Sequence, residues 1–204
     1  RPFIEELESR TLLASYTVNS VGDEPDADFD PDENPPSGNG ICADNSGACT
    51  LRAAIFEANL TPGPHTILFN LPAGSTTIAP GPGGLPKILQ PVIIEGRSQP
   101  GYSDHPLVEI TGALAGPGAN GLVLKGGNSI VRGLAITRFI HDGSLNNGFG
   151  IVLDNGSGNL IEANFLGVDT LGTTAKGNSS GIAIDEPSTG NLVANNVISC
   201  NELG

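Results

Sequence analysis

The chain has 204 residues, with 29 Gly, 16 Pro, no Met or Trp, and a formal net charge of −13. This charge repels phosphate backbones and anionic headgroups, and no basic patch in the sequence offsets it, so nucleic-acid and membrane-surface binding are set aside. No apolar run approaches the roughly 20 residues of a membrane-spanning helix, so we expect no membrane insertion. The dense turn residues, with Ile, Val, Leu and Ala between them, predict an all-β protein of many short strands.

Residues 1–15 are the first predicted element, an amphipathic segment. Its Phe, Ile and Leu residues fall roughly on one side of a helix, and its glutamates lie elsewhere. Within it, LESRTLLAS resembles the signature LE-x-R-x-LLS that many large exported bacterial proteins have near the N-terminus. The resemblance implies export, to the extracellular space or the cell surface, and it separates this segment from a domain that begins at residue 16.

An acidic loop follows the strand predicted for YTVNSV. Seven of the eleven residues from 23 to 33 are Asp or Glu, a density that requires exposure and causes self-repulsion unless a cation neutralises it. The aspartates at alternate positions are Asp26, Asp28, Asp30 and Asp32. They offer carboxylates from one side of an extended loop, which suits calcium, although the twelve-residue helix-loop-helix calcium motif does not fit. A calcium site and a solvated acidic loop both stay open.

The run CADNSGAC brings two cysteines close together. Its Asn, Ser and Gly let the chain bend back, which favours a disulfide between Cys42 and Cys49 over two reduced buried thiols. Closing so short a loop contributes about 2–3 kcal/mol and requires an oxidising compartment. Zinc is disfavoured because no His or further Cys lies nearby. Cys200 is left without a partner in this scheme.

Residues 50–59 are predicted to form a short helix. Thr50 is suited to cap its first turn, and the run TPGP after Asn59 stops it. One face of this helix is apolar, through Leu51, Ala54, Ile55 and Ala58. From residue 61 onward, brief apolar runs alternate with turns.

A repeat of about 30 residues dominates the second half of the chain. Segments 120–136, 149–167 and 180–199 align in their first halves at Gly121, Gly150 and Gly181 and in their second halves at Asn128, Asn159 and Asn191. Each segment predicts strand, turn, strand, turn, strand. Since no unit can bury its apolar side alone, neighbouring units must stack, with parallel strands about 4.8 Å apart.

The alignment makes further predictions about individual columns of this stack. The aligned asparagines are expected to pass amide hydrogen bonds from unit to unit. The residues expected to point inward are Ile130, Ile161 and Val193. A sharp left-handed bend is expected at Gly133, Asn164 and Asn196, because Gly and Asn enter that conformation most easily.

This repeat resembles the right-handed parallel β-helix, a solenoid. The run CTLRAAIFEAN at residues 49–59 resembles, more specifically, the N-terminal signature C-S/T-L-R-E-A-I-x-x-A-N of bacterial surface β-helix proteins, with Ala53 in place of the usual Glu. The resemblance implies a single β-helix domain over residues 16–204. Residues 16–60 would be its N-terminal cap, whose helix covers the open end of the coils, and residues 61–204 would be the coils. The last coil stops within a repeat, at Cys200 where such repeats commonly have Gly, so we expect either further chain or coverage by another molecule, including end-to-end self-association.

One column of the stack could hold chemistry. Four residues after the aligned glycines come Lys125, Asp154 and Asp185, a cation and two carboxylates on one face. Paired carboxylates can share a proton, bind calcium, or act as acid and nucleophile on a glycosidic bond. The alternative is that strand ends simply favour polar residues before turns. On the loop of residues 137–148, His141 and Asp142 are a second candidate acid and base.

Two functions follow. The first is a non-catalytic extracellular or cell-surface scaffold for adhesion, with a polysaccharide or a cell-envelope component as its partner. The second is a polysaccharide lyase or glycoside hydrolase with the fold of pectin-lyase-like enzymes. The local motifs of pectate-lyase-like and polygalacturonase-like enzymes are absent, and aromatic residues, which stack on sugar rings, make up only 4% of the chain. The scaffold is therefore favoured, with calcium as the only expected cofactor.

Overall fold

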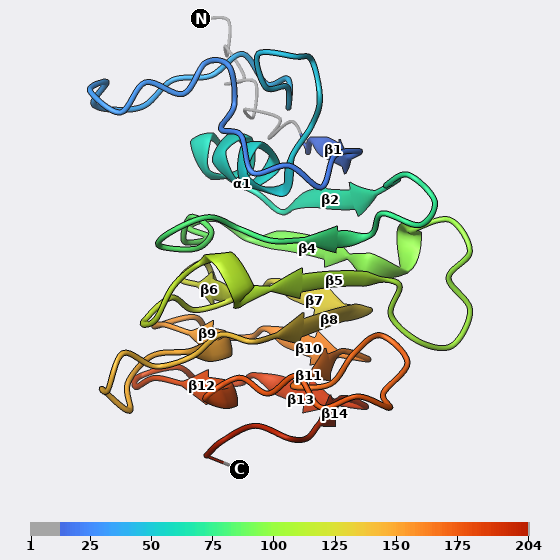
Figure 1. The fold of residues 1–204 in the computed structure, drawn as a ribbon. Helices are drawn as coiled ribbons and strands as arrows, with labels where there is room; N and C mark the ends of the chain where they lie inside the picture. The colour runs from blue at the N-terminus through green and yellow to red at the C-terminus, as the bar shows by residue number, and fades with distance from the viewer. Residues whose placement is uncertain (1–12, 204) are drawn as a thin grey trace, which may run out of the picture.

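The computed structural model describes residues 13–203 (Figure 1), so most of the predicted segment 1–15 lies outside the described residues. The described part has one α helix, α1 (Leu51–Leu60), and two short 3-10 helices, η1 (Gly96–Ser98) and η2 (Gly112–Leu114). Its strands are β1 (Ser15–Val18), β2 (His65–Phe69), β3 (Thr77–Ile78), β4 (Val92–Glu95), β5 (Val108–Thr111), β6 (Leu122–Leu124), β7 (Ile130–Arg132), β8 (Leu134–Thr137), β9 (Phe149–Leu153), β10 (Leu160–Glu162), β11 (Phe165–Leu166), β12 (Ser180–Ile184), β13 (Leu192–Ala194) and β14 (Val197–Ile198).

The strands form three sheets, and every pairing between these strands is parallel. The sheet orders are β1-β2-β4-β7-β10-β13, β14-β11-β8-β5-β3 and β12-β9-β6. From β4 onward the chain enters the three sheets in the same order each time, so residues about 30 positions apart become neighbours (Figure 1). The prediction of an all-β protein with parallel strands is confirmed.

The predicted alignment is correct at the glycines and wrong by one residue at the first asparagine. Pairing of β9 with β6 and β12 puts Gly150 between Gly121 and Gly181, as predicted. In the long sheet, however, Leu160 pairs with Ile130, so Asn159 lies beside Ser129 and not beside Asn128. The physical reason is the turn before β7. Asn128 takes a left-handed φ of 57° and forms part of this turn, so the position beside Asn159 falls to the next residue.

The same shift of one residue changes which side chain of β7 points into the core. Val131 is fully buried and pairs with Ile161, whereas Ile130 is only half-buried. The prediction of Ile130 as a core residue is therefore wrong. Side chains alternate between the two faces of a strand, so a register error of one residue turns every assigned side chain to the opposite face.

Asparagine ladders join successive strands. The side-chain oxygen of Asn191 accepts from the backbone N–H and the side-chain amide of Asn159, at 2.8 and 3.0 Å, and that of Asn159 accepts from the N–H of Ser129 at 2.8 Å. The amide ladder predicted for Asn159 and Asn191 is thus confirmed. A second ladder joins Asn164 to Asn196 in the same way, at 2.9 and 3.1 Å. Asn159 and Asn164 are buried, Asn191 and Asn196 are half-buried, and all four amides satisfy backbone groups at the turns between sheets.

The predicted left-handed bend is correct at Gly133, which has a φ of 71°, but wrong at Asn164 and Asn196. In those two units the residue one position earlier takes the conformation, Ala163 with a φ of 53° and Asn195 with a φ of 55°. The asparagines next to them hold the bend through the ladder described above. Asn164 and Asn196 therefore contribute the hydrogen bonds of their side-chain amides, and they do not themselves adopt a positive φ.

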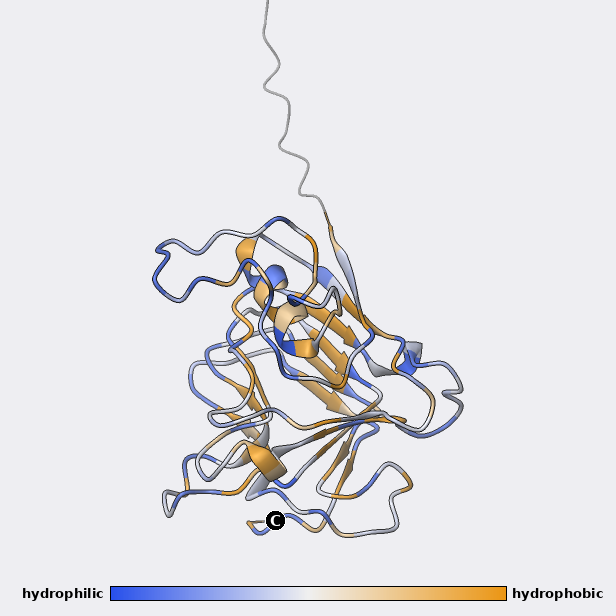
Figure 2. Cartoon of the chain, turned by 45° about the horizontal axis from the view of Figure 1, so that its top comes forward, coloured by the Kyte–Doolittle hydropathy of each residue, from blue (hydrophilic) through white to orange (hydrophobic). Residues whose placement is uncertain are grey.

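Helix α1 covers the end of the stack at which the chain begins, where it packs on β1 and β2 (Figure 1). The side chain of Thr50 accepts from the N–H of Ala53 at 3.0 Å, so the predicted cap is confirmed. The predicted apolar face is also confirmed, with Leu51, Ala54, Ile55 and Ala58 all buried. Figure 2 shows the hydrophobic strands running beneath this helix, with hydrophilic loops around them. Burial of about four aliphatic side chains stabilises the contact by several kcal/mol.

The structure contains the predicted disulfide between Cys42 and Cys49, with a Cα–Cα distance of 5.1 Å. The N–H of Cys49 donates to the Asn19 side chain at 2.9 Å, and Cys49 packs in the core. The disulfide closes the loop before α1, and the hydrogen bond to Asn19 ties this loop to the residue that follows β1. Cys200 is a free, exposed thiol with a φ of 62°, a conformation that Gly adopts more readily.

The other end of the stack is more exposed. Val193 and Ile198 are 38% and 43% exposed, whereas their counterparts one strand earlier, Ile161 and Leu166, are fully buried. Within residues 13–203 no helix comparable to α1 lies over β13 and β14. None of the helices in this part of the chain has the length and hydropathy needed to cross a membrane.

Candidate functional site

The predicted column of charged residues is present at the ends of β6, β9 and β12. The last residues of these strands pair in register, so Lys125, Asp154 and Asp185 follow one another across the sheet. The N–H of Asp154 donates to the Leu124 carbonyl at 2.9 Å, and that of Asp185 donates to the Leu153 carbonyl at 3.0 Å. The backbone therefore brings together all three residues that the sequence singled out.

Asp154 is held by two cations. Its carboxylate lies 3.3 Å from Nζ of Lys125 and 3.6 Å from Nζ of Lys87, and it accepts from the Asn155 amide at 2.9 Å. Partial burial raises the pKa of Asp154, but the hydrogen bonds and the two ammonium groups outweigh this effect and lower the pKa below its usual value. A carboxylate held in its ionised form cannot serve as the general acid of a glycosidase, which requires a raised pKa.

The loop residues His141 and Asp142 are occupied by contacts near their own loop. Asp142 accepts from the Asn147 amide at 2.9 Å and from the Ser144 N–H at 3.0 Å, and these bonds lower its pKa. His141 lies 3.3 Å from the carboxylate of Glu202. These contacts shape the loop before β9 and explain its polar residues without a catalytic role.

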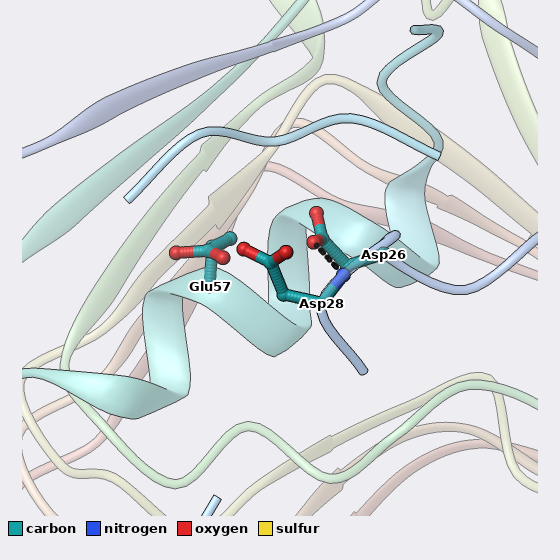
Figure 3. Close-up of side chains that lie close together, drawn as sticks. All are labelled: Asp26, Asp28 and Glu57. Atoms are coloured by element: carbon teal, nitrogen blue, oxygen red, sulfur yellow. Dashed lines mark hydrogen bonds between the residues drawn. The ribbon is translucent and has the colours of Figure 1, made fainter. Parts of the chain in front are cut away.

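A second group of charges lies where the acidic loop meets α1. Carboxylate oxygens of Asp26, Asp28 and Glu57 all lie within 4.8 Å of one another (Figure 3). Asp26 and Glu57 are only 3% and 2% exposed, and Asp28 faces solvent. We call these three residues the carboxylate cluster. The other two aspartates predicted to bind metal, Asp30 and Asp32, lie outside it in the exposed part of the loop.

Glu57 is the member of this cluster that the sequence reasoning missed. It comes from the buried side of α1, some 30 residues after the acidic loop, and it is the only acidic residue of that helix. An acid within a short, largely buried helix is the signal that could have identified it. Only the tertiary contact of loop and helix places it beside the aspartates.

Backbone hydrogen bonds fix the loop side of the cluster. The two carboxylate oxygens of Asp26 accept from the N–H groups of Asp28 and Ala43, at 3.1 and 3.0 Å. The Phe29 ring meets the Phe56 ring of α1 edge to face, with centroids 5.3 Å apart. The acidic loop is therefore docked on the helix at this point by both polar and aromatic contacts.

The Glu57 carboxylate is only half satisfied. Its Oε2 accepts from the Gly40 N–H at 3.0 Å, but its Oε1 is buried and has no hydrogen-bond partner. Burial, followed by the charges of Asp26 and Asp28, raises the pKa of Glu57 to about 7. Among the ion pairs of residues 13–203, none includes a member of the carboxylate cluster. The negative charge gathered there is uncompensated by the chain itself.

Raising the pH should therefore destabilise the metal-free protein through Glu57. Its pKa is about 7 in the folded chain against an ordinary 4.5, so its contribution is fully present below about pH 4.5 and is lost as the pH rises through about 7. The full loss is about 3 kcal/mol. The titratable groups that act on Glu57 are Asp26 and Asp28. Tyr16 also lies nearby, and its own pKa is raised by burial and by the charges of Glu57 and Asp26.

The measurement is thermal unfolding of wild type and Glu57→Gln in a buffer with chelator, from pH 5 to pH 8. Because Gln cannot ionise, the variant should melt close to wild type at pH 5 and higher than wild type at pH 8. Glu186→Gln, at an exposed side chain that takes part in none of the ion pairs of residues 13–203, is the control and should follow wild type throughout. A difference between Glu57→Gln and wild type that does not change with pH would contradict this prediction.

In comparisons with known proteins, no family model, no curated protein and no solved structure matches the chain.

Proposed function

We propose that the chain is an exported right-handed parallel β-helix module that serves as a non-catalytic scaffold for adhesion at the cell surface or outside the cell. The repeated order in which the chain enters three parallel sheets supports the coil, as does the offset of about 30 residues between paired strands. The CTLRAAIFEAN run, which forms the helix at one end of the strands, supports a capping domain like that of bacterial surface β-helix proteins. The disulfide fits an oxidising compartment.

The observation that most supports a scaffold over an enzyme is the environment of the Asp154 carboxylate. Two lysines and an amide hold this carboxylate ionised, so Asp154 does not supply the proton that an acid–nucleophile mechanism requires. The lysines are themselves paired to it and are not free to abstract a proton, as a lyase base must. What remains is a column of one cation and two carboxylates at the ends of three paired strands, which suits contact with a polar polymer such as a polysaccharide of the cell envelope.

The experiment is incubation with a panel of polysaccharides, with and without calcium, followed by analysis for new reducing ends and unsaturated products. In parallel, retention of the protein on the same immobilised polysaccharides is measured. We expect retention on at least one polymer and no product. The double variant Asp154→Asn, Asp185→Asn and the exposed control Asp104→Asn are tested beside wild type.

The outcomes separate the two functions. Product that forms with wild type and with Asp104→Asn, but not with the double variant, would replace the scaffold by a lyase or hydrolase acting through this column. Absence of both product and retention would contradict the proposed contact with glycans.

A further inference from the structure

The carboxylate cluster is built like a binding site for a hard cation. Three carboxylates from two distant segments, Asp26 and Asp28 in the loop and Glu57 in α1, bring oxygens to within 4.8 Å of one another. In Figure 3 the Asp28 carboxylate lies between those of the other two residues. Two oxygens that bind the same calcium ion at 2.3–2.6 Å are separated by at most about 5 Å, so the observed spacing fits one shared ion.

An independent observation points to a missing ligand. Oε1 of Glu57 is fully enclosed, belongs to a residue that is only 2% exposed, and has no hydrogen-bond partner. Buried carboxylate oxygens without a donor are rare because the lost hydration is not replaced. The second oxygen of the same group accepts from the Gly40 N–H, so the carboxylate is held in place beside those of Asp26 and Asp28.

The charge around the cluster leads to the same conclusion. Arg52, the basic residue of α1, forms an ion pair with Asp23 at 2.7 Å and is not paired with the cluster. Three carboxylates that gather without a cation repel one another, and two of these three are also desolvated. A divalent ion would offset most of this charge and give the free oxygen a partner.

We propose that Asp26, Asp28 and Glu57 bind one calcium ion, which fastens the acidic loop to the helix that covers the end of the strands. All of the donors are oxygens, which excludes the softer metals that select His or Cys. Calcium tolerates an irregular set of carboxylates completed by water, and the exposed side at Asp28 leaves room for water. Magnesium demands near-ideal octahedral geometry at about 2.1 Å and gives up its water reluctantly.

The ion would add a link between the acidic loop and α1 to the contacts already described, which are Phe29 on Phe56 and the Gly40 N–H on Glu57. The segment of residues 30–41 is exposed along its whole length, and the cluster lies where this segment leaves and rejoins α1. Calcium bound there stabilises the docked loop and, through it, the helix. This inference is independent of the proposed scaffold function, because the site holds the loop on the helix whether the module is a scaffold or an enzyme.

The test uses the full chain, stripped with chelator and dialysed, in calcium titration by calorimetry and in thermal unfolding with and without about 5 mM calcium. We expect one ion per chain with a dissociation constant of about 10⁻⁴–10⁻³ M, the range of extracellular calcium modules. The melting temperature should rise by about 4 °C. Magnesium at the same concentration should give a clearly smaller rise.

Three variants assign the response to residues. Asp28→Asn and Glu57→Gln should weaken calcium binding at least tenfold and abolish the rise in melting temperature. Neither change removes a buried apolar group, and melting in chelator shows that each variant is folded. Asp32→Asn, in the same loop but outside the cluster, is the matched control and should respond like wild type.

The proposal is overturned if wild type shows no calcium-dependent heat or melting shift, or if Glu57→Gln responds as wild type does. It is also overturned if Asp32→Asn loses as much affinity as Asp28→Asn, because the ion would then sit in the exposed loop and not at the helix. An equal response to magnesium would remove the assignment to calcium.

Discussion

Replacing Asn164 with alanine is expected to lower the free energy of unfolding by about 3 kcal/mol, the sum of two orphaned backbone groups. Asn164 is fully buried between β10 and β11. Its oxygen accepts from the Leu134 N–H at 3.1 Å, and its amide donates to the Val131 carbonyl at 2.9 Å and to Asn196 at 3.1 Å. Alanine removes the hydrogen bonds that the amide makes to these two buried backbone groups.

Urea denaturation followed by circular dichroism measures this effect. Asn146→Ala, at an exposed position in the loop before β9, is the matched control and should change stability by less than about 0.5 kcal/mol. Equal losses in the two variants would show that the ladder does not hold the turns between sheets.

A second large effect is expected at a partly buried ion pair. Nζ of Lys176 lies 2.8 Å from both carboxylate oxygens of Glu109, and the Thr137 hydroxyl donates to one of them at 2.8 Å. The Glu109 side chain is 9% exposed. Lys176→Met keeps the aliphatic stem and removes the charge, so it leaves a nearly buried carboxylate with a single donor. We expect a loss of about 3 kcal/mol.

The control is Lys87→Met, the same change at a side chain that is 57% exposed and 3.6 Å from Asp154. It should cost less than about 1 kcal/mol, because exposed ion pairs contribute little. The double variant Lys176→Met, Glu109→Gln should recover part of the loss, since the uncompensated charge is then gone. No recovery would mean that the packing of the lysine stem, and not its charge, determines the effect.

The features that the sequence predicted correctly are local or periodic. The cap by Thr50 and the apolar face of the helix follow from the spacing of residues along one turn. The disulfide follows from two cysteines in a loop that can bend back. The parallel strands and the column of Lys125, Asp154 and Asp185 follow from a repeat whose units cannot bury their apolar sides alone.

The errors arose where one residue of register decides the outcome. After a turn, a strand can begin one residue earlier or later, and the amino-acid sequence alone does not distinguish these two registers. The turn that contains Asn128 is one residue longer than the alignment assumed. Ser129 therefore lies beside Asn159, and Val131 lies in the core. Hydrogen bonding across the stack selects the register, and it depends on the neighbouring strands.

By itself, the sequence determined the class of fold, the helix that covers one end and the order in which charged side chains follow one another along the strand ends. The tertiary structure alone decided which charges meet. It pairs Lys87 with Asp154 and Lys176 with Glu109, and it brings Glu57 beside the acidic loop. Electrostatic energy and ligand geometry depend on distances of a few ångströms between segments that are far apart in the chain, and only the packed molecule sets those distances.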